Sequence, residues 1–189
     1  MTVTAKRGAR SLTPRQQEGR AVNAVAEMLR KRLSVPNIYL EPPSSVIAAD
    51  LLAVDRAGAG DLHAVEVKLH VEFVRLPAPN DRKAGWISVM RKRKLTELRD
   101  HLMSLPAHYR YLAIPRASWD LVTGEFGPLL YSPDGIGRLG IITIADRGEN
   151  PPTAELSIAP ERFRVDPVKL GNVEKKLLQK VRPDIEVRI

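Results

Sequence analysis

The sequence contains no cysteine, and this absence excludes several kinds of protein. Without thiols the chain has no disulfide framework, no thiolate metal site and no cysteine nucleophile, and it fits a reducing compartment. Long apolar runs are also missing, and residues 1–14 (MTVTAKRGARSLTP) lack the apolar core of a signal peptide. Together these absences predict a cytoplasmic protein that does not cross a membrane.

Several enzyme signatures are absent as well. The chain contains no G-x-S-x-G sequence, no Walker A sequence and no H-E-x-x-H zinc motif. Its four histidines show no spacing typical of metal ligands: His63, His70, His101 and His108. Gly135–Gly140 matches G-x-G-x-x-G, but it leads into an apolar strand instead of opening a helix. We therefore interpret these glycines as a turn and exclude a dinucleotide site.

Positive charge is what the sequence has in excess, with 30 Lys and Arg against 22 Asp and Glu and a net charge of +8. Such an excess favours a polyanionic partner, and nucleic acid comes first. Residues 1–10 are basic and are predicted to be a disordered arm. The most basic segment surrounds Trp86 and contributes Arg82, Lys83, Arg91, Lys92, Arg93 and Lys94. This composition indicates a surface for nucleic-acid backbones; the alternative is a solvated helix start with Trp86 in the core.

Alternating helix and strand patterns over residues 11–189 predict a single α/β domain, with a mixed, partly parallel central sheet flanked by helices. The first helix is expected from Pro14 to about Leu33, with Thr13 as its N-cap. Its apolar stripe is Val22, Val25, Leu29 and Leu33. Glu18 precedes Val22 by one turn and is predicted on the buried side; the alternative is a solvent-facing acid near the helix start.

The remaining elements are expected at regular intervals along the chain. Strands are predicted at Asn37–Glu41, on both sides of residues 56–60, and at Tyr109–Ile114, Ile141–Ala145, Ala154–Ile158 and Ile185–Ile189. One helix is predicted to end at about Leu105, with an apolar stripe of Leu95, Leu98, Leu102 and Leu105. Another helix is predicted from Pro167 to about Val181.

The stretch from Val46 to His70 predicts a hairpin, because two apolar runs flank the Gly-rich residues 56–60. With this loop, Asp55 pairs with Asp61. Asp50 then lies opposite Glu66, and Ala48 lies opposite Lys68. Because side chains alternate along a strand, Asp50, Glu66 and Lys68 share one face of the sheet.

Two opposed carboxylates in an apolar hairpin require a physical explanation. They repel each other and are costly to bury, and a divalent cation with oxygen ligands offsets both effects. The alternative is an ordinary hairpin whose charges reach solvent at a sheet edge, but both faces of these runs are apolar. If the register differs, Asp55 and Asp61 are alternative acids, although acids beside a turn are commonly solvated.

Asp50 followed on the next strand by Glu66-Val67-Lys68 resembles the motif of the PD-(D/E)XK nuclease superfamily, which has the restriction-endonuclease-like fold. Ala49 stands where the pattern often has Pro. The similarity extends loosely from Glu18 to about Pro115. The segment after Pro115 also resembles the MmcB-like branch of this superfamily.

The resemblance implies a metal-dependent nuclease that hydrolyses phosphodiester bonds, first of all in DNA, in repair, restriction or element defence. It implies Mg²⁺, or Mn²⁺, held by Asp50, Glu66 and the backbone carbonyl of Val67, with Glu18 acting through water. Lys68 would orient the attacking water or stabilise charge in the transition state. Hydrolysis would leave a 5′-phosphate.

The resemblance carries three further expectations. Members often place a basic or amide residue on the helix after the hairpin, for which Lys92 and Lys94 are candidates. Many members dimerise, so a homodimer is a possible assembly. The alternative function is a nucleic-acid-binding module that keeps the fold without the activity.

Overall fold

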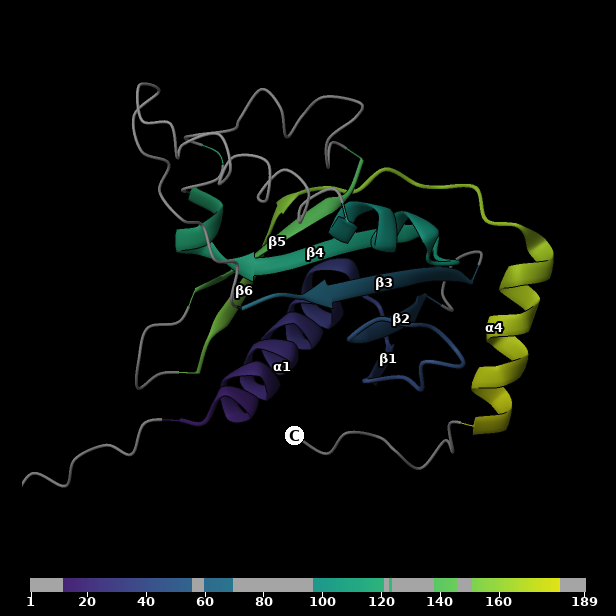
Figure 1. Cartoon of the computed structure of the whole chain (residues 1–189), viewed down its shortest axis with the longest axis horizontal. Coiled ribbons are helices and arrows are strands. Elements are labelled where there is room, and N and C mark those ends of the chain that lie inside the picture. The colour runs from purple at the N-terminus through teal and green to yellow at the C-terminus, as the bar shows by residue number, and fades with distance from the viewer. Residues whose placement is uncertain are drawn as a thin grey trace, which may run out of the picture.

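The computed structural model describes residues 12–55, 60–69, 97–120, 123, 138–145 and 151–180 (Figure 1). The two long helices are α1 (Pro14–Leu33) and α4 (Pro167–Lys180). The strands are β1 (Asn37–Leu40), β2 (Leu51–Asp55), β3 (Asp61–Val67), β4 (Tyr109–Pro115), β5 (Gly140–Ala145) and β6 (Thr153–Ile158). Residues 97–104 and 116–120 are also helical.

The six strands form one sheet in chain order, β1-β2-β3-β4-β5-β6. Strands β1, β2 and β3 are antiparallel neighbours, β3, β4 and β5 are parallel neighbours, and β6 returns antiparallel to β5. Parallel neighbours need a crossover connection, and the helix at 97–104 lies within the connection from β3 to β4. The predicted α/β class, with a mixed sheet flanked by helices, is confirmed.

Helix α1 begins as its sequence predicts. The Thr13 hydroxyl accepts a hydrogen bond from the Gln16 amide at 3.3 Å, and Gln16 Oε1 accepts one from the Thr13 amide at 2.9 Å. This capping box satisfies two amides that the first turn leaves without helical partners. The helix ends before Ser34, which adopts the left-handed conformation with φ 54°.

The sheet separates two apolar cores, and helices cover both of its faces. One core packs α1 against the sheet and includes Val25, Leu29, Val65, Tyr111 and Ile142. The other packs the helix at 97–104 and α4 against the opposite face and includes Leu62, Leu102, Ile141, Val173 and Leu177. Strand β3 is buried from Leu62 to Val67, as its two apolar faces predict.

The hairpin register is confirmed, because Asp55 pairs with Asp61 and Leu51 pairs with Val65. The expectation that the first strand extends back to Ala48, opposite Lys68, is wrong. Residues 44–46 form a turn and residues 48–50 a bend, since the amides of Val46 and Ile47 both donate to the carbonyl of Pro43. Proline has no amide hydrogen for a strand ladder, so the chain turns after Pro43 and joins the sheet only at Leu51.

The other element boundaries agree with the sequence to within one residue wherever the structure describes them. Strand β1 ends at Leu40, before Glu41, whose positive φ of 45° turns the chain out of the sheet. Several predictions lie outside the described residues: the arm at 1–10, the basic segment at 82–94, the glycines at 135–137 and the strand at 185–189. Among the helices in the described part of the chain, none combines the length and apolar character needed to cross a bilayer.

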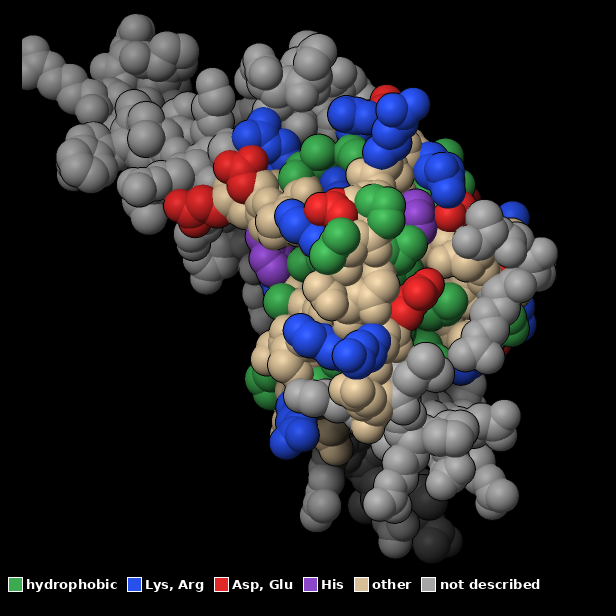
Figure 2. Space-filling view, turned by 90° about the vertical axis from the view of Figure 1, so that its right-hand side faces the viewer, with side chains coloured by type: hydrophobic (Ala, Val, Ile, Leu, Met, Phe, Trp, Pro, Cys, Tyr) green, Lys and Arg blue, Asp and Glu red, His purple; other side chains and the backbone are tan. Residues whose placement is uncertain are grey.

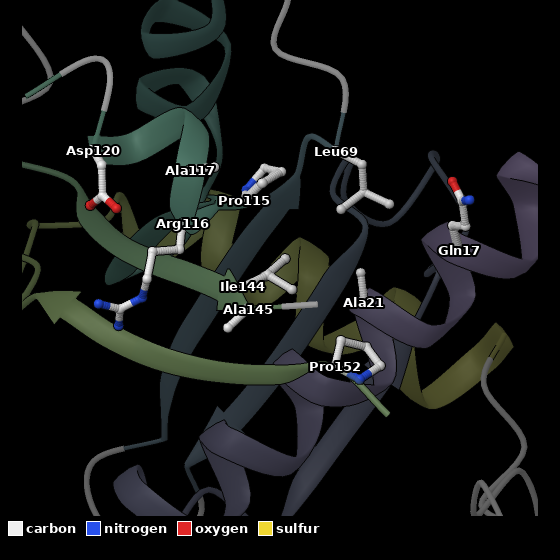
Figure 3. A pocket seen from close by; sticks show the side chains of 10 residues that line it. All are labelled: Gln17, Ala21, Leu69, Pro115, Arg116, Ala117, Asp120, Ile144, Ala145 and Pro152. Atoms are coloured by element: carbon white, nitrogen blue, oxygen red, sulfur yellow. The ribbon is translucent and has the colours of Figure 1, made fainter. Parts of the chain in front are cut away.

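Two surface features bear on function. Figure 2 shows the side of the molecule that carries α4, where basic side chains are interspersed with acidic and apolar ones. A pocket lies where α1 meets the carboxyl ends of β4 and β5 (Figure 3).

Candidate functional site

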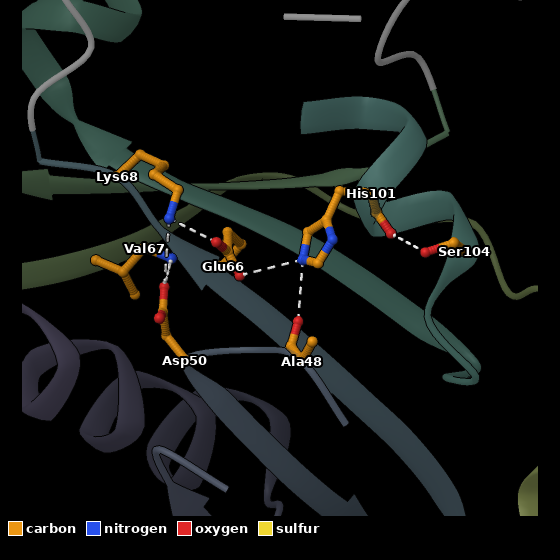
Figure 4. A network of polar contacts seen from close by, with 7 residues as sticks. All are labelled: Ala48, Asp50, Glu66, Val67, Lys68, His101 and Ser104. Carbon is orange, nitrogen blue, oxygen red and sulfur yellow. Dashed lines mark hydrogen bonds and ion pairs between the residues drawn. The ribbon is translucent and has the colours of Figure 1, made fainter. Parts of the chain in front are cut away.

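Asp50, Glu66 and Lys68 meet where β2 begins and β3 ends (Figure 4). Lys68 Nζ lies 2.5 Å from Glu66 Oε1 and 4.0 Å from Asp50 Oδ2. The structure thus brings together the three residues that the hairpin register places on one face. The ammonium group stands between two carboxylates that would otherwise face each other without a counter-charge.

Backbone hydrogen bonds hold Asp50 in place. Its amide donates to the Val65 carbonyl at 3.1 Å, and its own carbonyl accepts from the Glu41 amide at 2.8 Å. Its carboxylate Oδ2 accepts from the Val67 amide at 2.6 Å. The side chain therefore bonds to β3 just beyond the end of the regular ladder, and a charge-assisted bond of this kind restricts its orientation.

The burial of the three side chains differs, and this sets their electrostatics. The exposed fractions are 11% for Glu66, 29% for Asp50 and 43% for Lys68. Burial by itself would lower the pKa of the Lys68 ammonium, but its hydrogen bond to Glu66 and nearby negative charges raise that pKa above its usual value. These charges belong to Glu66, Asp50 and Glu18. Lys68 is accordingly a permanent cation at neutral pH.

Glu18 occupies a different position from the predicted one. It is exposed, because the buried residues of α1 begin only at Ala21 and the first turns extend beyond the packed region. The prediction of a buried side chain is therefore wrong. Its charge still acts on Lys68, so Glu18 lies within electrostatic reach of the cluster.

His101 joins the cluster, and the sequence did not indicate this role. Its Nε2 lies 3.0 Å from the Ala48 carbonyl oxygen and 3.7 Å from Glu66 Oε2 (Figure 4). Because a carbonyl oxygen only accepts, Nε2 carries the hydrogen. His101 follows Leu98 by three residues and precedes Leu105 by four, so it lies on the apolar stripe of its helix. That spacing was the available signal. The sequence-based candidates on this helix, Lys92 and Lys94, lie outside the described residues.

The donor atoms of the cluster suit a hard divalent cation. Asp50 and Glu66 contribute carboxylate oxygens, and the Val67 carbonyl is adjacent in the chain. Within the described residues, no group of three or more His, Asp or Glu side chains is arranged to hold a metal. Mg²⁺ commonly uses one or two carboxylates and keeps several waters, so two carboxylates and a carbonyl fit it.

The alternative acids lie at the opposite end of the hairpin. Asp61 accepts two hydrogen bonds from Arg162, at 2.8 and 3.1 Å, and lies 3.5 Å from His108 Nδ1. The hydrogen bond from Arg162 holds the pKa of Asp61 below its usual value. This pair ties β3 to the segment before α4. We interpret Asp61 as structural.

Comparisons with known proteins do not assign a function. No family model and no curated protein matches the sequence. A solved structure, the SPO1766 protein of unknown function from Silicibacter pomeroyi, is similar to this chain with a TM-score of 0.45 and 16% sequence identity. The match covers 89% of this chain and 86% of that chain.

Proposed function

We propose that this protein is a metal-dependent nuclease of the PD-(D/E)XK type that hydrolyses phosphodiester bonds in nucleic acid, with DNA as the first candidate. The observation that carries the proposal is the meeting of Asp50, Glu66 and a charged Lys68 at the ends of two neighbouring strands. The net charge of +8 supports a polyanionic substrate. A cytoplasmic location belongs to the same proposal, since the chain has no cysteine.

In this proposal each residue has a defined task. Asp50, Glu66 and the Val67 carbonyl would hold Mg²⁺ or Mn²⁺, and the bound ion would supply Lewis-acid activation of water. The Val67 amide keeps Asp50 oriented by its bond of 2.6 Å. Lys68, which remains protonated, orients the attacking water or offsets negative charge that develops on the phosphate.

Calorimetric titration with Mg²⁺ and Mn²⁺ tests the metal site directly. Wild-type protein is expected to bind, and Glu66→Gln is expected to lose binding because a neutral amide replaces a mostly buried carboxylate. Glu27→Gln is the matched control, since Glu27 is an exposed acid of α1 that pairs with Lys31 and not with the cluster. Equal binding by wild type and Glu66→Gln would contradict the assignment.

Cleavage assays on DNA and RNA then test the activity. Asp50→Asn, Glu66→Gln and Lys68→Met should each lower the cleavage rate by about 100-fold or more, because each removes a charge at the reacting phosphate. Glu27→Gln should cut at the wild-type rate. Cleavage by all three site variants at the wild-type rate would exclude this site.

A nucleic-acid-binding module without catalysis is the second candidate. The observation in its favour is that Lys68 already neutralises Glu66 at 2.5 Å, so the carboxylates have a counter-charge without any metal. Salt-dependent DNA binding, with neither metal binding nor cleavage, would select this candidate.

A further inference from the structure

The ammonium group of Lys68 lies where a cation shared by Asp50 and Glu66 would lie. Its Nζ is 2.5 Å from Glu66 Oε1 and 4.0 Å from Asp50 Oδ2, and Figure 4 shows it reaching toward both carboxylates. Mg²⁺ binds carboxylate oxygens at about 2.0–2.1 Å, so an ion held by these two oxygens would lie within a few ångström of Nζ. Two cations this close repel each other, and the repulsion is poorly screened beside a carboxylate that is only 11% exposed. A metal ion and the Lys68 ammonium therefore compete for the same carboxylates.

Lys68 can give up this position without any change in the main chain. Its backbone amide donates to the Ala113 carbonyl at 2.8 Å, which holds the chain just beyond β3 against β4. Its side chain is 43% exposed, and the flexible stem of a lysine lets the ammonium reach solvent while the stem stays packed. Movement of the ammonium into solvent therefore requires only a change of side-chain rotamer.

Both carboxylates have a second contact that the ammonium does not provide. Asp50 Oδ2 accepts a hydrogen bond from the Val67 amide at 2.6 Å. Glu66 Oε2 faces His101 Nε2 at 3.7 Å, and the Ala48 carbonyl holds this histidine at 3.0 Å. The two acids therefore keep their places when the ammonium moves away.

We propose that Lys68 is an internal counter-cation that a divalent metal ion displaces from Glu66, so that metal binding and the Lys68–Glu66 ion pair exclude each other. The inference rests on the proposed function and adds how metal occupancy of the site is regulated: the ion pair raises the metal concentration that the site requires. Displacement also frees the ammonium for the water or phosphate on which the proposed function needs it. Removal of the ammonium should therefore strengthen metal binding and weaken cleavage.

Calorimetric titration of the full chain with Mg²⁺ and Mn²⁺, without nucleic acid, tests the competition. Lys68→Met keeps the apolar stem without the ammonium, so it should bind at least about tenfold more tightly than wild type. Lys68→Arg keeps the charge and pairs readily with a carboxylate, so it should bind no more tightly than wild type. Lys31→Met is the matched control, because it removes one positive charge from an ion pair with Glu27 and should bind as wild type.

Nuclear magnetic resonance of wild-type protein with ¹⁵N-labelled lysine follows the ammonium directly and does not depend on a variant of unknown stability. The Lys68 Nζ signal, identified by its absence from Lys68→Arg, should shift when Mg²⁺ is added, because the contact with Glu66 is lost. The signal of Lys31, which pairs with Glu27, should stay unchanged. An unchanged Lys68 signal at a metal concentration that saturates the calorimetric titration would overturn the inference.

The outcomes separate this inference from the proposed function. Metal binding by wild type with equal or weaker binding by Lys68→Met would overturn the displacement and leave the proposed metal site in place. Binding by Lys68→Met alone would support the displacement and contradict a metal-dependent activity of the wild type. Absence of binding in both proteins would overturn the displacement and the metal site together.

Discussion

At the scale of single residues, His63 shows how burial determines protonation. Its ring stacks on Tyr109 with centroids 4.7 Å apart, and its Nδ1 lies 3.0 Å from the Tyr111 hydroxyl. Burial, which outweighs the charges of Asp55 and Asp61, lowers the pKa of His63 to about 4. The imidazole is therefore neutral in the folded protein over a range in which the unfolded chain is protonated.

The first prediction concerns the effect of pH on stability. Between pH 6.5 and about 4 the unfolded chain binds more protons at His63 than the folded chain does, so stability falls as pH falls. The loss is on the order of 3 kcal/mol. His63→Phe keeps an aromatic ring beside Tyr109 but cannot titrate, so its stability should vary less with pH. Urea unfolding at pH 7.5, 6, 5 and 4 measures both proteins, and parallel pH curves would contradict the account.

The positions of the candidate-site residues were predictable only where near neighbours in the chain determine them. Glu66 and Asp50 were identifiable because the hairpin loop sets their register, and the register is local information. The exposure of Glu18 was not identifiable, because it depends on where α1 leaves the sheet. His101 contacts Ala48 across 53 positions; its place on the apolar stripe indicates that it faces the sheet, but no sequence spacing identifies its partner.

At the scale of elements, two glycines differ in the space that surrounds them. Gly140 begins β5, and a Cβ placed there would lie 2.5 Å from Tyr111 Cδ1 and 3.0 Å from Pro160 Cδ. Gly171 lies within α4, and a Cβ there would meet nothing within 4 Å. Close packing against a buried ring requires glycine at the first position, whereas the second only lowers helix propensity.

The second prediction is therefore a pair of matched substitutions. Gly140→Ala should destabilise the protein by about 1–3 kcal/mol, because the methyl group overlaps a ring that cannot move in the core. Gly171→Ala should stabilise it by about 0.5–1 kcal/mol through helix propensity. Chemical denaturation measures both free energies of unfolding. Equal effects of the two substitutions would show that the close approach at Gly140 is not limiting.

Helices and strands were predictable wherever local rules decide them. The Thr13 cap and the stripe of Val22, Val25 and Leu29 placed α1 correctly, since capping and periodicity depend on near neighbours. The start of β2 was predicted too early in the chain, because an apolar run does not distinguish a strand from a buried turn. Val46 and Ile47 are buried in a turn that follows Pro43.

At the scale of the whole molecule, the proposed function predicts that the excess of positive charge governs association with nucleic acid. Basic side chains on the α4 side are interspersed with acids and apolar residues (Figure 2), which does not indicate a continuous binding track on that face. The sequence instead concentrates cations at residues 82–94, which lie outside the described residues. We expect that segment to bind most of the backbone phosphates.

The third prediction compares two variants of equal charge. Lys92→Gln with Lys94→Gln should reduce the steepness of the salt dependence of DNA binding, by about 0.9 for each phosphate that the variant no longer neutralises. Lys169→Gln with Lys175→Gln, on the exposed face of α4, removes the same charge and should leave the salt slope near wild type. Anisotropy titrations over a range of salt concentrations give both slopes. Identical slopes for the two variants would show that net charge alone matters.

The sequence by itself determined the class of fold, the hairpin register and the meeting of Asp50, Glu66 and Lys68, because each follows from interactions between residues close in the chain. Only the tertiary structure decided that His101 completes the cluster, that Glu18 is exposed and that a pocket forms where α1 meets the carboxyl ends of β4 and β5. Those features depend on how α1, the helix at 97–104 and the ends of the parallel strands pack together. Their relative placement minimises the exposed apolar surface of the whole molecule, and no short segment of the chain carries that information.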